Sequence, residues 1–106
     1  MKKKYIVKKN HEFQEIIGLR VFIKTDPYYI YFRKNNLNYP RFGISVGKKL
    51  GNAVLRNKVR RQIRSMITID PNLNIQGYDY IIIVKKNYFK NSYFINKEVL
   101  LKNLKK

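Results

Sequence analysis

The stretch of sequence that decides the fold is KKLGNAVLRNKVRRQIR, which occupies residues 48–64. It contains seven Lys and Arg residues and no Asp or Glu. Apolar residues recur in it, and just beyond it, at the spacing of one helical face: Leu55, Val59, Ile63 and Met66. The sequence therefore predicts a helix that buries one face and presents a strongly basic face to a polyanionic partner.

The predicted basic helix extends from about residue 53 to residue 69. Asn52 is a suitable N-cap, because its side chain can accept a hydrogen bond from a backbone N–H of the first turn. Asp70-Pro71 should end the helix, since proline cannot donate the next backbone hydrogen bond and restricts the residue before it. The basic face consists of the row Arg56, Arg60 and Arg64, widened by Asn57 and Arg61.

Hydrophobic alternation and turn residues predict the elements on either side of this helix. We expect a short helix at residues 10–18 with Asn10 as its N-cap, strands at 21–23, 28–33, 42–46 and 79–84, and a last helix after Ser92. The last strand is continuously apolar after its first residue, which favours a central strand covered on both faces. Lys105 and Lys106 would lie at the C-terminal end of the last helix, where its dipole favours cations. The predicted order is α-β-β-β-α-β-α, and a β-α-β unit contains the basic helix.

The net charge of +18, from 24 basic and 6 acidic residues, dominates the composition. Such a chain repels itself unless an anionic partner screens it, which indicates nucleic acid first and an anionic membrane surface second. The length of 106 residues suits one domain, in which the basic residues 1–8 should form a tail that stays mobile until a partner binds. Because the chain has no cysteine and no apolar run long enough to span a bilayer, we expect a cytoplasmic protein.

The reactive side chains exclude most catalytic and metal-binding arrangements. His11 is the only histidine, so neither a Ser-His-Asp triad nor a zinc-binding HExxH helix is expected. The spacing of the six acids does not suggest the converging carboxylates that a two-metal nuclease requires. Glu12 and Glu15 could share a cation weakly, although acids near a helix start also interact favourably with its dipole. We therefore expect no catalytic residue and no metal ligand.

A second candidate binding feature is aromatic. Tyr29 and Tyr31 alternate onto the same strand face as Arg33, and Phe13 would join them if the first helix packs beside that face. Tyrosines among basic residues can stack on the bases of single-stranded nucleic acid. The same residues can equally be core aromatics that close a small sheet, and the pattern alone leaves both interpretations open.

The segment around the basic helix resembles the signature of the bacterial ribonuclease P protein subunit. The matching residues are Ser45-Val46, Lys48-Lys49, Gly51-Asn52-Ala53-Val54, Arg56-Asn57-Lys58 and Arg60-Arg61. Lys58 stands where the family has arginine, so the charge is kept but the bidentate fork is lost. The likeness extends to residues 7–13 and 79–83, whereas Ile17 stands where relatives often carry a second phenylalanine.

This resemblance implies an α/β (α+β) fold, a two-layer sandwich with a mixed four-stranded sheet similar to the second domain of a ribosomal protein. It also implies a left-handed β-α-β crossover, against the general right-handed rule. The resemblance further implies that ribonuclease P RNA binds Mg²⁺ and removes the 5′ leader of precursor tRNA. The protein would contact both RNAs, would be inactive alone, and would need no membrane and no obligate protein partner.

The resemblance implies two sets of site residues. The residues facing RNA would be Lys48, Lys49, Asn52, Arg56, Asn57, Lys58, Arg60, Arg61 and Arg64. The residues lining a cleft for the 5′ leader would be Phe13, Ile17, Tyr29, Tyr31 and Arg33. Composition alone fits two alternatives: a structural ribosomal protein or other basic RNA-binding protein, and a DNA-binding protein whose arginine row enters the major groove.

Overall fold

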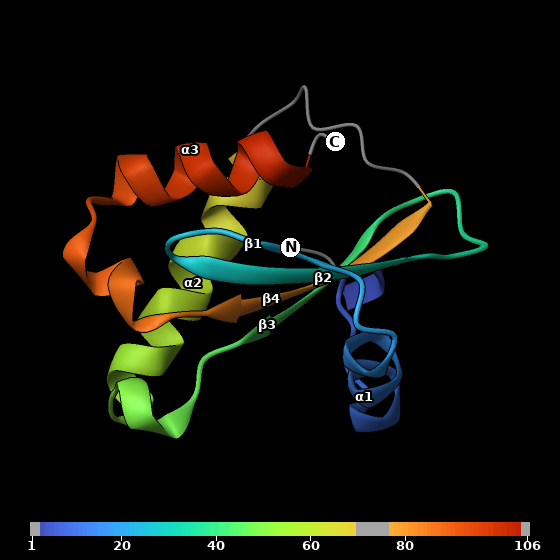
Figure 1. The fold of residues 1–106 in the computed structure, drawn as a ribbon, viewed down its shortest axis with the longest axis horizontal. Helices are drawn as coiled ribbons and strands as arrows, with labels where there is room; N and C mark the ends of the chain where they lie inside the picture. Colours follow the sequence, from blue (N-terminus) through green and yellow to red (C-terminus); the bar gives the residue numbers. More distant parts are fainter. Residues whose placement is uncertain (1–2, 70–76, 105–106) are drawn as a thin grey trace.

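The sheet at the centre of the structure has the strand order β1-β2-β4-β3 (Figure 1). The computed structural model describes residues 3–69 and 77–104. Its strands are β1 (Phe22–Lys24), β2 (Tyr28–Lys34), β3 (Arg41–Ser45) and β4 (Tyr78–Val84). β3 and β4 are parallel, whereas β1 with β2 and β2 with β4 are antiparallel, so the sheet is mixed. The predicted α+β class with a mixed four-stranded sheet is confirmed, although the helices lie on both faces of the sheet and not in a single second layer.

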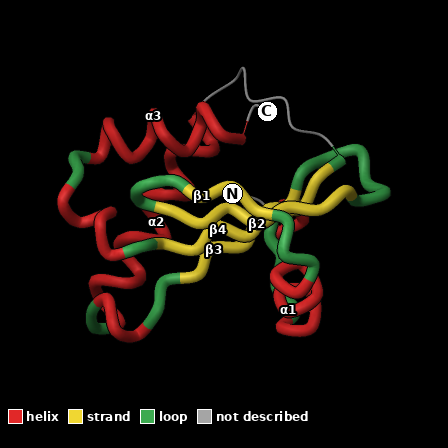
Figure 2. The backbone as a smooth tube through the Cα atoms, in the orientation of Figure 1, coloured by secondary structure: helices red, strands yellow, loops and turns green. Residues whose placement is uncertain are grey.

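Helices cover both faces of this sheet. Helix α1 (Asn10–Gly18) lies on one face, and α2 (Ala53–Ile69) and α3 (Tyr93–Leu104) lie on the other (Figures 1 and 2). Short 3-10 turns complete the described residues: η1 (Lys3–Tyr5), η2 (Lys48–Leu50) and η3 (Lys86–Lys90). The predicted β-α-β unit is β3-α2-β4, and its left-handed sense stays a prediction.

The main core lies between the sheet and helices α2 and α3. Strand β2 contributes the buried Tyr28 and Ile30, and central strand β4 contributes Ile82. The predicted apolar stripe of α2 faces them, with Val59 and Ile63 almost fully buried. The alternation predicted for β2 is therefore confirmed: Phe32 packs against the same core as Tyr28 and Ile30, whereas Tyr31 packs under α1 on the other face.

The predicted caps of α2 and α3 are confirmed, and the cap of α1 is wrong. The Asn52 side-chain oxygen accepts a hydrogen bond of 2.9 Å from the Leu55 N–H, and the Ser92 hydroxyl accepts one of 3.3 Å from the Ile95 N–H. Lys9, not Asn10, occupies the N-cap of α1, since its carbonyl already accepts the first N–H groups of the helix. The predicted stop at Asp70-Pro71 and the terminal Lys105-Lys106 lie outside the described residues.

The prediction of a mobile basic tail is wrong for residues 3–8. Ile6 forms a parallel β-bridge with Phe42, and the Val7 N–H donates a 2.9 Å hydrogen bond to the Phe42 carbonyl. The Val7 side chain is buried beside Ile16 and Ile81, under α1. Backbone pairing at Ile6 and Val7 and burial of the Val7 side chain beneath α1 therefore fix this segment to the sheet.

Candidate nucleic-acid interface

The outer side of α2 carries the predicted basic face. Asn57, Lys58 and Arg61 are exposed, whereas the row Arg56, Arg60 and Arg64 is half-buried against neighbouring side chains. Asn57 accepts a 2.9 Å hydrogen bond from the Arg60 guanidinium, which orients that side chain along the helix. The face is thus a partly ordered array of donors.

Two observations show that this array is not neutralised internally. Within residues 3–69 and 77–104, no carboxylate forms an ion pair with a basic residue of α2. The Nε atom of Arg56 is buried and has no hydrogen-bond partner in the same part of the chain. A buried unpaired donor is costly, and no side chain of the described residues competes with a phosphate for the guanidinium of Arg56.

The start of α2 extends the same surface. Lys48 and Lys49 are exposed in η2, and Asn52 is exposed at the N-cap. The side-chain oxygen of Asn52 caps the helix, so the side-chain NH₂ group is the part of this residue that can bind a partner. All nine residues predicted to face RNA therefore lie on η2, on the following N-cap, or on α2.

The residues predicted to form a leader cleft belong to the opposite face of the sheet. Phe13, Ile17 and Tyr31 are half-buried and pack around a small apolar cluster under α1. The Phe13 ring lies directly over Gly43, where an added Cβ would be 2.5 Å from the Phe13 Cζ atom. Glycine is therefore required for α1 to approach the sheet this closely.

Aromatic side chains continue this face beyond α1. Phe22, which is 43% exposed, stacks on Tyr31 with ring centroids 4.8 Å apart and meets Tyr29 edge-on at 5.9 Å. The Lys85 ammonium lies 4.7 Å from the centroid of the Tyr29 ring. Sequence reasoning missed Phe22, because only the strand register, in which it pairs with Tyr31, shows that it joins the two tyrosines.

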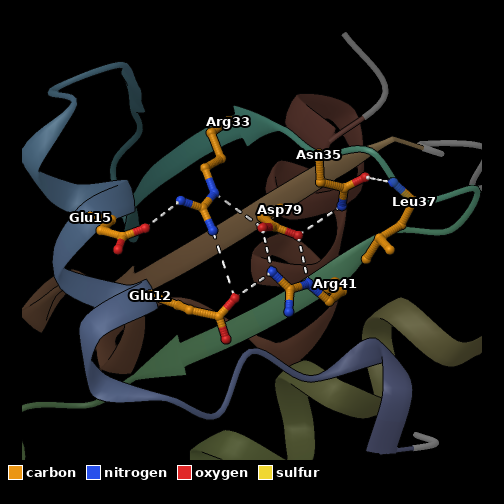
Figure 3. Close-up of polar contacts among 7 residues, drawn as sticks. All are labelled: Glu12, Glu15, Arg33, Asn35, Leu37, Arg41 and Asp79. Atoms are coloured by element: carbon orange, nitrogen blue, oxygen red, sulfur yellow. Dashed lines mark hydrogen bonds and ion pairs between the residues drawn. The ribbon is translucent and has the colours of Figure 1, made fainter.

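The fifth predicted cleft residue, Arg33, is engaged in an ion cluster at the end of the sheet (Figure 3). Asp79 is completely buried on β4, with Arg33 beside it on β2 and Arg41 beside it on β3. Arg41 donates to both Asp79 oxygens at 2.9 and 2.7 Å, Arg33 donates at 3.2 Å, and Asn35 donates at 2.8 Å. Arg33 thus shares a face with the tyrosines, but its charge is already paired.

Helix α1 is fastened to this cluster by its two acids. Glu12 accepts a 2.8 Å hydrogen bond from Arg41, and Glu15 accepts one of 3.0 Å from Arg33 (Figure 3). Burial alone would raise the pKa of Asp79, but hydrogen bonds and charges from Arg41, Asn35 and Arg33 outweigh it and lower this pKa. The hydrogen bond from Arg41 likewise lowers the pKa of Glu12. The carboxylates of Asp79 and Glu12 are therefore ionised at neutral pH, and both arginine charges are paired within the cluster.

In the part of the chain that the structure describes, no three His, Cys, Asp or Glu side chains are grouped to hold a metal ion. Across residues 3–69 and 77–104, no helix combines the length and the apolar character needed to cross a membrane.

Comparison with known proteins decides the family. The family model described as Ribonuclease P matches residues 1–106. The chain belongs to the ribonuclease P protein family. Among its relatives, the ribonuclease P protein component of Mesoplasma florum is 48% identical, over 96% of this chain and 94% of the relative. The ribonuclease P protein component of Mycoplasma mycoides subsp. mycoides is 45% identical, over 99% of this chain and 97% of the relative.

Solved structures of the ribonuclease P protein family have the same fold. The ribonuclease P protein of Thermotoga maritima superposes with a TM-score of 0.85 at 27% identity, over 93% of this chain and 94% of that one. The Staphylococcus aureus protein superposes with a TM-score of 0.81 at 34% identity, over 91% and 88% of the two chains. The chain is therefore a protein subunit of ribonuclease P that acts in tRNA 5′ processing and partners the ribonuclease P RNA.

Proposed function

We propose that the chain joins two RNAs, with the basic face of α2 on ribonuclease P RNA and the aromatic face beside α1 on the 5′ leader of precursor tRNA. The observation that carries this proposal is the arginine row of α2, which lacks any ion-pair partner among the described residues. Arg56 and Arg60 are its centre, because one has an unpaired buried Nε and the other is oriented by Asn57.

The charge of the chain explains why such a subunit would help. Ribonuclease P RNA and precursor tRNA are both polyanions, and their phosphates repel one another where they meet. A net charge of +18 placed at their junction reduces that repulsion and lets the complex form at modest Mg²⁺.

The aromatic face suits the leader because the leader is single-stranded. Tyr29, Tyr31 and Phe22 present partly exposed rings, with the Lys85 ammonium beside them. Unstacked bases gain about 1–3 kcal/mol each on such rings, and the gain depends little on base identity. The face can therefore bind leaders of different sequence.

In this proposal the RNA subunit performs the cleavage with Mg²⁺, and the protein supplies no catalytic residue. The carboxylates of Asp79 and Glu12 are both bonded to the guanidinium of Arg41, so they do not form an open set of oxygens for a divalent cation. The protein alone would not cleave RNA. We further propose that it works in the cytoplasm and needs no obligate protein partner.

The test is cleavage of a leader-bearing precursor tRNA by ribonuclease P RNA at low Mg²⁺, with and without the protein. Wild type should restore cleavage, and Arg56→Ala/Arg60→Ala should not. The matched control is Lys34→Ala/Lys102→Ala, which removes two exposed charges outside α2 and outside the aromatic face and should behave as wild type. If the Arg56→Ala/Arg60→Ala protein restored cleavage fully, the proposed α2 interface would be wrong.

The leader arm of the proposal has its own test. Tyr31→Leu keeps an apolar side chain under α1 but removes the aromatic ring. It should weaken binding of precursor tRNA with a leader and leave binding of mature tRNA unchanged. Equal weakening for both tRNAs would contradict a leader site, and no weakening for either would show that Tyr31 does not contact the leader.

A further inference from the structure

Two neighbouring cavities lie next to the basic face of α2, and one residue lines both of them. The smaller, of about 170 Å³, lies between α2, η3 and the start of α3. The larger, of about 460 Å³, lies between η2 and η3. Phe89, which is 41% exposed, lines both. Lys58 lines the smaller cavity and Lys49 the larger, so both are continuous with the basic face.

The smaller cavity combines aromatic walls with hydrogen-bonding groups. Its walls include Tyr88 and Tyr93. The Gln62 side-chain oxygen accepts a 2.8 Å hydrogen bond from the Tyr88 hydroxyl, and its amide nitrogen has no partner among the described residues. The side-chain nitrogen of Asn91 donates to Asn96 at 3.1 Å and to Asp26 at 3.3 Å. The side-chain oxygen of Asn91 is left as an acceptor. Among the residues that line the cavity, Gln62 thus has a free donor and Asn91 a free acceptor within the described part of the chain.

The larger cavity supplies positive charge. Lys49, Lys86 and Lys90 line it, together with Leu50 and Phe89. No Asp or Glu lines either cavity. The smaller volume is well below the range of roughly 300–1,000 Å³ that drug-sized ligands occupy, so it suits a single planar ring. A planar ring with donor and acceptor edges, attached to an anion, describes a nucleotide.

We propose that these adjoining cavities bind one unpaired nucleotide of an RNA partner, with its base in the smaller cavity against Phe89 and its phosphates at Lys49, Lys86 and Lys90. The proposal rests on the proposed RNA-binding function and extends that interface from α2 to η3 and the start of α3. The amides of Gln62 and Asn91 would contact the edge of the base. The site would fix the register of the RNA on the protein, whereas the arginine row supplies affinity without regard to sequence.

A matched pair of phenylalanines tests this proposal in the full chain. Phe89 and Phe94 are both exposed, and each meets the tyrosine before it edge-on with ring centroids 5.7 Å apart. Only Phe89 lines the two cavities. Phe89→Leu should weaken RNA binding roughly 5-fold to 100-fold, the loss expected for one stacked base, while Phe94→Leu should change it less than about 2-fold. Phe89→Tyr should restore binding, because it keeps the stacking ring.

The source of the nucleotide is found by measuring two equilibria. Binding of the protein to ribonuclease P RNA alone, and binding of precursor tRNA to the assembled complex, are compared for each variant. A Phe89→Leu loss in the first assigns the nucleotide to ribonuclease P RNA, and a loss only in the second assigns it to precursor tRNA. Wild-type behaviour in both, or equal losses for Phe89→Leu and Phe94→Leu, would overturn the proposal.

The Arg56→Ala/Arg60→Ala variant separates this inference from the function on which it rests. If that variant loses RNA affinity and Phe89→Leu does not, the nucleotide site is wrong and the α2 interface stands. If both retain wild-type affinity, the proposed interface itself is wrong. Thermal unfolding of each variant must match wild type within a few degrees, and a Phe89→Tyr protein that is stable yet fails to bind RNA would also overturn the site.

Discussion

Two pairs of arginines in this molecule differ in whether carboxylates pair with them. Arg33 and Arg41 lie at the end of the sheet, where Asp79, Glu12 and Glu15 neutralise them. Arg56 and Arg60 lie on α2, where no described carboxylate reaches them. The first pair holds α1 on the sheet, and the second pair remains available to a partner.

The comparison shows that the few acids of the chain, not its many cations, decide what each arginine does. Glu12, Glu15 and Asp79 are half of the six acids in the sequence, and all three are in the sheet-end cluster. Residues 53–69, which form α2, contain no acid at all. A strongly basic protein can therefore build a stable fold and an RNA-binding surface from the same residue type by placing a few carboxylates in one region.

The largest expected effect comes from breaking the sheet-end cluster. Asp79→Ala would leave Arg33 and Arg41 facing one another without the buried carboxylate between them. We expect the free energy of unfolding, measured by urea denaturation, to fall by about 3–5 kcal/mol. Glu98→Ala, an exposed acid on α3, serves as the control and should stay within about 0.5 kcal/mol. A loss below about 1 kcal/mol for Asp79→Ala would show that the cluster does not hold the fold together.

Substitutions on α2 should have the opposite effect, with little change in stability and a large loss of RNA affinity. Arg56→Ala/Arg60→Ala should change the free energy of unfolding by no more than about 0.5 kcal/mol but weaken RNA binding roughly 10-fold to 100-fold. If about five side chains of the wild type meet phosphates, its log affinity should fall with log salt at a slope of roughly −3.5 to −4.5. The double variant should reduce that slope by about 1.4–1.8, and an unchanged slope would mean that neither arginine contacts a phosphate.

A smaller effect separates capping from binding at the start of α2. Asn52→Ala removes the hydrogen bond to the Leu55 N–H and should cost about 1 kcal/mol of stability. Asn52→Asp keeps the cap and suits the helix dipole, so it should unfold like wild type in a thermal scan. Its negative charge should nevertheless weaken RNA binding. If Asn52→Asp bound RNA normally, Asn52 would be a cap only.

The smallest expected effect is that of pH on the stability of the fold over the neutral range. The pKa values of Asp79 and Glu12 are lowered in the folded state, so their contribution to stability is complete above the ordinary carboxylate range near 4 and is lost as pH falls through the folded values. Stability measured by urea denaturation should therefore stay nearly constant from pH 8 to about 5 and decline in acid. Asp79→Asn should flatten the acid decline, and a decline that began near pH 6 would point to another titrating group.

The sequence was sufficient to predict α2 because each local signal agrees there. The apolar stripe through Val59 and Ile63, the cap at Asn52 and the absence of acids all indicate one helix with one basic face. The strands were predictable for a similar reason, since β2 alternates and β4 is continuously apolar after its first two residues.

What the sequence could not predict depends on contacts between distant residues. Asp79 meets Arg33 and Arg41 only because the register of β2, β4 and β3 places them side by side, and no local pattern encodes that register. Phe22 joins the aromatic face for the same reason. The N-terminal segment was mistaken for a mobile tail because its surrounding lysines outweigh the two apolar residues, Ile6 and Val7, that dock it on β3.

That docked segment has a consequence for the protein before it meets RNA. β3 is an outer strand, and an outer strand exposes backbone groups to which a strand from another chain can add, which is one route to aggregation. Ile6 and Val7 occupy part of that position by bonding to Phe42. On the opposite side β1 is only three residues long, which offers little length for pairing. Both edges of the sheet are thus poor templates for pairing with another chain. The protein is therefore protected from aggregation through its sheet edges before it binds RNA.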